Sequence, residues 1–147
     1  MSFQRNAIIA TTLFTSVAAL LLPGLASRAQ TPTNHREAYL VKQDQSDCTN
    51  TTVPKSDSPN TLGILEIVRG TDGNTRVKVA MTVSPNTTYH FFLKCVRQLG
   101  DITTGDEGVG TAVFTFPTNA TGPVYAFDMY PEGAPPGNKF QSVTVNF

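Results

Sequence analysis

The sequence has no tryptophan, only two histidines, only two cysteines and no excess of either charge. Eleven basic residues balance eleven acidic ones, so the chain lacks the basic stripe that nucleic-acid binding requires. Two histidines are too few for a centre built from several imidazoles, so no metal or other cofactor is expected. The lack of tryptophan also argues against an aromatic platform for carbohydrate.

The first 29 residues have the order of a secretory signal peptide. Arg5 and the α-amine form a positive start, an apolar stretch covers 7–22, a Pro-Gly pair ends it, and Ser27 and Ala29 are the small residues of a cleavage site. A retained membrane anchor is the alternative, because the apolar stretch is almost long enough to cross a bilayer. The helix-breaking pair favours cleavage. We therefore predict an exported protein, periplasmic or extracellular, that meets the membrane only through its signal peptide.

Export makes a disulfide permissible, and Cys48 and Cys95 are the only two cysteines that can form one. Two buried free thiols are the alternative. In the chain-entropy model, closing a loop of this length stabilises the fold by roughly 4 kcal/mol. We predict a Cys48–Cys95 disulfide that ties down a long polar loop over 44–60.

Beyond a polar tail over 30–36, predicted to be flexible, the chain alternates between short β-rich runs and turn clusters. The Asp-Gly pair at 72–73 is the strongest hairpin signal. No stretch has a helical period. We predict one domain over 37–147, an all-β, seven-stranded antiparallel Ig-like β-sandwich, because each strand has one apolar face to bury. The expected strands cover 37–43, 62–69, 75–83, 88–96, 111–116, 124–130 and 140–147.

The stretch VAMTVSPNTTYHFF, residues 79–92, resembles a corner of fibronectin type III and Ig-like domains. Pro85 matches the turn proline of that corner, Thr87 its threonine and Tyr89 its tyrosine. The resemblance implies that the Tyr89 hydroxyl bonds back to the backbone a few residues earlier. The turn PTNATG is similar to one in uncharacterised exported bacterial β-sandwich proteins. Such a resemblance implies a fold and carries no function.

The period of two divides the strand over 88–96 into two faces. Copper-zinc superoxide dismutases and chordin-type domains carry alternating histidines on a comparable strand. Here the residue two positions after His90 is Phe92, so the comparison implies no metal activity. The expected inward residues are Tyr89, Phe91, Leu93 and Cys95, and the expected outward residues are His90, Phe92 and Lys94.

Few residues offer catalytic chemistry. A hydrolase would need a nucleophile and an orienting carboxylate around His90, and the sequence contains no nucleophile-elbow pattern. Asp101, Asp106 and Glu107 lie in a glycine-containing stretch read as a loop, where they would form either a solvated cluster or a weak Ca²⁺ site.

Three Asn-X-Thr sequons, at Asn50, Asn86 and Asn119, fall in expected loops or turns, where glycosylation would be sterically allowed. A separate feature is a predicted contact surface, which combines an outward phenylalanine with a tyrosine and a proline-rigid loop. Its residues are Phe92, Tyr130, Pro131, Pro135 and Pro136.

These observations predict an exported, non-catalytic protein with a binding, cell-envelope or structural role, whose partner is an unknown protein or cell-envelope component. The first alternative is a subunit of a surface filament or assembly that uses β-strand addition. The polar tail argues against it, because a donor strand should alternate apolar residues. The second alternative is a small secreted hydrolase that uses His90.

Overall fold

The structure, a computed structural model, describes residues 34–43, 47–50, 53, 61–134 and 139–147. The chain divides into two units, Met1–Gln30 and Thr31–Phe147, and every described residue belongs to the second. The predicted signal peptide therefore lies outside the described residues, as do Pro135 and Pro136.

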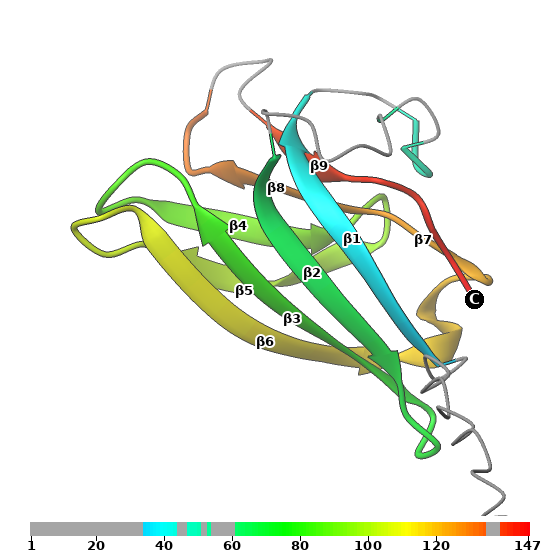
Figure 1. Cartoon of the computed structure of the whole chain (residues 1–147). Helices are drawn as coiled ribbons and strands as arrows, with labels where there is room; N and C mark the ends of the chain where they lie inside the picture. The colour runs from blue at the N-terminus through cyan, green and yellow to red at the C-terminus, as the bar shows by residue number, and fades with distance from the viewer. Residues whose placement is uncertain (1–33, 44–46, 51–52, 54–60, 135–138) are drawn as a thin grey trace, which may run out of the picture. The chain divides into compact units, whose positions relative to one another are not determined.

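The described part of the chain is all-β, as predicted (Figure 1). Eight strands form one antiparallel sheet in the order β5-β4-β8-β9-β1-β2-β3-β6, and β7 pairs with β10 in a two-stranded sheet. The strands are β1 His35–Lys42, β2 Thr61–Arg69, β3 Asn74–Thr82, β4 Thr88–Leu93, β5 Arg97–Thr103, β6 Val109–Pro117, β7 Val124–Tyr125, β8 Phe127–Pro131, β9 Phe140–Ser142 and β10 Val145–Asn146, with a 3₁₀ turn, η1, at Thr118–Ala120.

The prediction of a seven-stranded sandwich is wrong. The eight strands form one continuous sheet that nearly closes into a barrel. Continuity comes from β1, which pairs with β2 along one edge and with β9 along the other. Strands β5 and β6, at the two ends of the order, approach each other through side chains. A side chain placed on Gly110 of β6, for example, would meet the Ile102 side chain of β5 at 3.1 Å.

The strands expected from the sequence also differ from those of the structure: one strand is missing, and two expected strands are each split into two. Strand β5 is absent from the expected strands, because its Gly100-Asp101 pair predicts a loop. The run over 124–130 forms β7 and β8, and the run over 140–147 forms β9 and β10. Each of these runs therefore contributes to both sheets.

Strand β1 begins at His35, two residues before the predicted start, and lies inside the sheet. Its register with β2 runs from His35 opposite Val68 to Val41 opposite Thr61. Because both edges of β1 are paired, this segment cannot complete the sheet of another copy without leaving its own.

The single apolar face expected of a strand is confirmed on β3, where Val77 and Val79 are fully buried and Lys78 between them is exposed. The hairpin at the Asp-Gly pair is confirmed as well, because β2 and β3 are joined by a turn with Gly73 at φ 79°. In that turn the Asp72 carboxylate accepts hydrogen bonds from the side-chain and backbone N–H groups of Asn74, which hold the pKa of Asp72 below its ordinary value.

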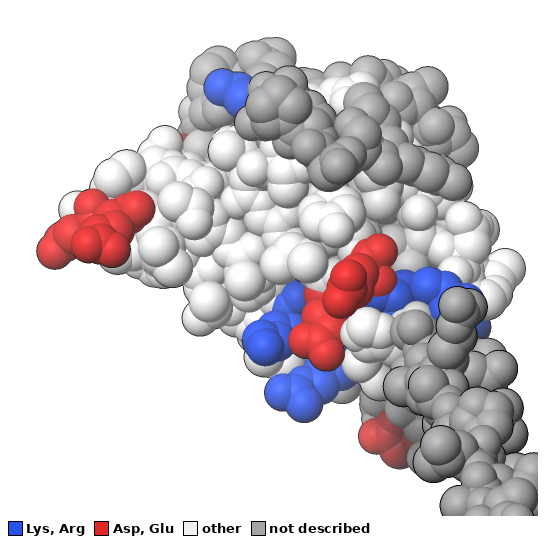
Figure 2. All heavy atoms as spheres, viewed as in Figure 1, with Lys and Arg blue, Asp and Glu red and all other residues white. Residues whose placement is uncertain are grey.

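Charge gathers in separate places on the face seen in Figure 2. Acidic and basic side chains mix over β2 and β3, where Lys78 Nζ lies 3.8 Å from Glu66 Oε2. A separate acidic patch lies at the tip of the β5–β6 turn, which carries the exposed Asp106 and Glu107. The outer face between the two is uncharged.

Candidate functional site

Phe92 of β4 and Tyr130 of β8 stack on the outer face of the sheet. Their ring centroids are 5.0 Å apart and their planes differ by 13°. His90, opposite Tyr130 in the β4–β8 register, approaches the tyrosine ring edge-on with centroids 6.2 Å apart. Alternate residues of a strand point to the same face of the sheet. Because β4 and β8 are paired, rings from distant parts of the sequence therefore lie side by side on that face. We call His90, Phe92 and Tyr130 the aromatic surface.

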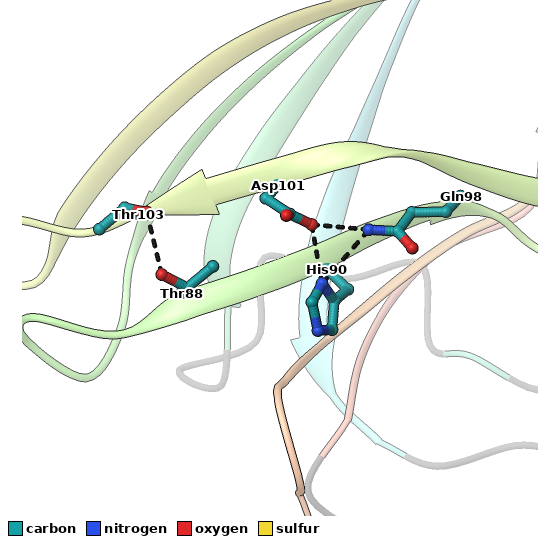
Figure 3. A network of polar contacts seen from close by, with 5 residues as sticks. All are labelled: Thr88, His90, Gln98, Asp101 and Thr103. Carbon is teal, nitrogen blue, oxygen red and sulfur yellow. Dashed lines mark hydrogen bonds and ion pairs between the residues drawn. The ribbon is translucent and has the colours of Figure 1, made fainter.

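A polar network borders the aromatic surface on β5 (Figure 3). His90 Nδ1 lies 2.7 Å from Asp101 Oδ1, and Gln98 Nε2 donates to the same oxygen at 2.6 Å. Because a carboxylate only accepts hydrogen bonds, this contact places the proton of a neutral His90 on Nδ1 and leaves Nε2 as an acceptor. Figure 3 shows the second ring nitrogen pointing away from Asp101 and Gln98.

A hollow of about 330 Å³ lies beside the stacked rings. Its lining residues include Phe92, Tyr130, the cationic Arg97 and Lys139, and the acidic Asp128. Lys139 Nζ is 5.5 Å from the centroid of the Tyr130 ring, within the range of a cation–π contact. The site therefore combines aromatic side chains with both cationic and anionic hydrogen-bonding groups.

The structure places a carboxylate beside His90 that the sequence does not reveal. The sequence predicts a loop at Asp101, but β5 places this residue opposite His90. The described partners of the His90 ring are Asp101, Gln98 and Tyr130, and none of them is a serine, threonine or cysteine. Thr88, two residues before His90, has its hydroxyl 3.0 Å from that of Thr103.

The acidic residues considered together in the sequence are separated in space. The Asp101 side chain faces His90 on the sheet, whereas Asp106 and Glu107 are exposed in the β5–β6 turn. Within the part of the chain that the structure describes, no three metal-ligating side chains gather at one point.

The corner residues have a structural role. The Tyr89 hydroxyl accepts a hydrogen bond from the Ser84 amide at 3.3 Å, which is the contact that the corner resemblance implies. The Thr87 hydroxyl donates to the Pro85 carbonyl at 2.8 Å. Thr104 adds a contact that the sequence did not reveal, because its hydroxyl donates to the Ser84 carbonyl at 2.7 Å. This corner fixes the start of β4, which carries His90 and Phe92 of the aromatic surface.

Cys48 and Cys95 form a disulfide, as predicted, with Cα atoms 5.5 Å apart. The predicted burial of Cys95 and the predicted exposure of Lys94 are wrong. Strand β4 ends at Leu93, and Cys95 is an exposed turn residue with φ 57°, while Lys94 is only 7 % exposed. Cys95 lies beyond the end of β4, where the alternation of side chains stops, and Lys94 is covered by Asn50, whose Oδ1 accepts from its Nζ.

Asn50 is fully buried, so its side chain is not accessible to glycosylation in the folded chain. Its Nδ2 donates to the carbonyls of Phe127 at 3.3 Å and Ser142 at 3.2 Å, and its Oδ1 accepts from Lys94 Nζ. The two carbonyls belong to β8 and β9, so the Asn50 amide bridges these strands just beyond their last paired residues. The sequons at Asn86 and Asn119 lie in an exposed turn and in η1.

Of the predicted contact surface, Phe92 and Tyr130 meet, and Pro131 ends β8 directly after the tyrosine. Pro135 and Pro136 lie outside the described residues. No helix among the described residues is long and apolar enough to cross a membrane. Comparison of the chain with known protein families, characterised proteins and solved structures gives no match.

Proposed function

We propose that this chain is an exported, non-catalytic protein that binds a protein of the cell envelope through the aromatic surface. The observation that carries the proposal is the Phe92–Tyr130 stack on the outer face of the sheet, beside an open hollow with polar groups. Aromatic and arginine side chains are enriched in protein contact surfaces. An aromatic ring combines a large contact area with few rotatable bonds.

The ring arrangement favours a protein partner over a sugar. Phe92 and Tyr130 cover one face of each other, and Lys139 and His90 approach Tyr130 as well. The pair therefore presents ring edges and flanking polar groups rather than an open platform for a sugar ring. A protein surface can place side chains in the hollow and hydrogen bonds on its rim.

A binding role accounts for His90 more simply than hydrolysis does. Acyl transfer needs a nucleophile within hydrogen-bond reach of the base, and the described partners of the ring provide none. The Asp101 contact instead fixes the ring orientation and leaves Nε2 as an outward acceptor for a partner. Export is supported by the N-terminal sequence and by the disulfide, which persists in oxidising compartments.

We infer, in addition, that the sheet derives from an Ig-like arrangement. The order β5-β4-β8-β9-β1-β2-β3-β6 consists of two four-stranded halves that are joined by strand pairing at β1–β9. The Tyr89–Ser84 contact supports the same inference.

Site-specific photocrosslinking tests the proposed function. A photoreactive amino acid replaces Phe92 in the full chain in its native host, and a matched variant carries it at Val113, which is 47 % exposed on β6. Irradiation of the Phe92 variant should yield one discrete heavier species that the Val113 variant lacks. Adding Tyr130→Ala to the Phe92 variant should reduce its yield at least several-fold, because the stack that orients position 92 is lost.

Three outcomes would overturn the proposal. The first is no light-dependent species at position 92, and the second is the same species at both positions. The third is a product that contains two copies of this chain, which would indicate self-association instead of a separate partner.

A further inference from the structure

A buried lysine and a buried asparagine meet where the Cys48 segment lies against the sheet. Lys94 follows β4 directly, and its backbone N–H donates to the Ala126 carbonyl at 2.9 Å. Its side chain is 7 % exposed, and its Nζ donates to Asn50 Oδ1. Asn50 itself is 0 % exposed. An amine and a carboxamide are thus held in contact with water largely excluded.

A carboxylate lies next to this pair. Asp128 of β8 is opposite Phe92, and Phe127 is opposite Leu93, so Lys94 and Asp128 are diagonal neighbours on one face of the β4–β8 pair. Such neighbours have Cα atoms about 7–8 Å apart, which long side chains can span. Asp128 is also buried, at 8 % exposed. The Asp128 carboxylate is therefore within reach of the Lys94 side chain.

We propose that Lys94 and Asn50 join in an intramolecular isopeptide bond. The neutral Lys94 Nζ attacks Asn50 Cγ, and the Nζ–Cγ bond forms as the carbonyl electrons move to Oδ1. Asp128 takes a proton from Nζ and delivers it to Nδ2. The carbonyl then re-forms, the Cγ–Nδ2 bond breaks, and Nδ2 leaves as ammonia with the electron pair of that bond. The product is a secondary amide, and the step needs no oxidant, reductant or added reactant.

Three features of the site favour this step. Burial disfavours the charged form of a lysine and so favours the nucleophilic amine. The Phe127 and Ser142 carbonyls both accept from Nδ2, so they fix the amide and stabilise the leaving nitrogen as it gains a proton. The Cys48–Cys95 disulfide lies two residues from Asn50 and one from Lys94, and it holds both groups in place. Holding reactants together in this way supplies a large part of the barrier reduction in intramolecular reactions.

Mass spectrometry of the full chain tests the proposal independently of the aromatic surface. The protein is reduced and denatured, and its N-terminal residue is determined. Its intact mass is then compared with the mass calculated from the sequence that starts at that residue. We expect a deficit of one ammonia. Proteolysis should yield a branched peptide containing Asn50 and Lys94, and trypsin should not cleave after Lys94. This measurement uses the unmodified protein and does not depend on the folding of any variant.

Lys94→Arg is the matched control, because it keeps a long cationic side chain at the same position. Its mass should show no deficit, and Asp128→Asn should lower the fraction of protein with the deficit at least several-fold. An intact mass without the deficit, with Lys94 found in linear peptides, would overturn the proposal. A deficit that persists in Lys94→Arg would also overturn it, since ammonia would then be lost elsewhere, for example in a succinimide.

Discussion

At the scale of single residues, Gly100 shows why a glycine can belong to a strand. Phe114 of β6 packs so close to Gly100 of β5 that a Cβ there would lie 2.6 Å from its Cε1 atom. The same ring stacks on Phe91, with centroids 5.3 Å apart, and Phe91 stacks on Phe127 at 5.6 Å. Three rings from β6, β4 and β8 therefore cross the interior, and Gly100 makes room at one end of the row.

We expect Gly100→Ala to destabilise the fold by about 1–3 kcal/mol, because the added methyl group overpacks the Phe114 ring. Thermal unfolding should show a melting temperature lower by several degrees. Gly122→Ala is the control, since a Cβ there meets no atom within 4 Å. Equal melting temperatures for the two variants would contradict the account of Gly100.

At the scale of elements, the disulfide holds the Cys48–Asn50 segment against the ends of β4, β8 and β9. Cys48 is bonded to Cys95, and the Asn50 amide bridges carbonyls of β8 and β9. The two cysteines are 47 residues apart, so the bond closes a long loop of the unfolded chain. An isopeptide bond between Asn50 and Lys94 would close nearly the same loop.

Reduction of the disulfide should therefore lower the stability fully only in a variant in which no isopeptide bond also joins the Cys48–Asn50 segment to the residues after β4. In Lys94→Arg, we expect dithiothreitol to lower the free energy of unfolding by up to about 4 kcal/mol, as the chain-entropy model gives for such a loop. The measurement is a denaturant titration with and without reductant. Cys48→Ser with Cys95→Ser in the same background should not respond. If Lys94→Arg is equally stable in both conditions, the disulfide does not stabilise this segment.

The sequence was most informative where strands alternate cleanly. The pattern on β3, the Asp-Gly turn and the forced cysteine pairing each depend on neighbours in the chain or on a count, and all three are confirmed. The sequence was least informative where two interacting residues are far apart along the chain. The role of Asp101 follows from its register opposite His90, and the burial of Lys94 follows from contact with Asn50. Neither interaction leaves a local signal.

At the scale of the whole described domain, Arg69 links the two sheets. Its guanidinium carbon lies 4.4 Å from the Phe147 ring centroid and 5.1 Å from that of Tyr125, and its Nε donates to the Tyr125 hydroxyl at 3.0 Å. Arg36 of β1 also approaches Phe147, at 5.1 Å. The β7–β10 pair is thus held against the strands β1 and β2 by cation–π contacts.

We expect Phe147→Ala to destabilise the fold by about 1–2 kcal/mol, because a half-buried ring and two cation–π contacts are lost. Hydrogen exchange should accelerate most at the paired residues of β7 and β10, with little change in the β2–β3 hairpin. Val113→Ala, on the outer face of β6, is the control. Unchanged exchange in β7 and β10 would show that Phe147 does not hold the two sheets together.

The position of β1 also governs the order in which the sheet can be completed. Its first neighbour, β2, follows soon along the chain, whereas its second, β9, begins only at Phe140. Closing that pair requires nearly all of the domain to have been synthesised, and such distant pairings make folding slow. The sheet therefore stays open beside β1 until the final segment emerges, so the early part of the chain cannot complete the native fold alone.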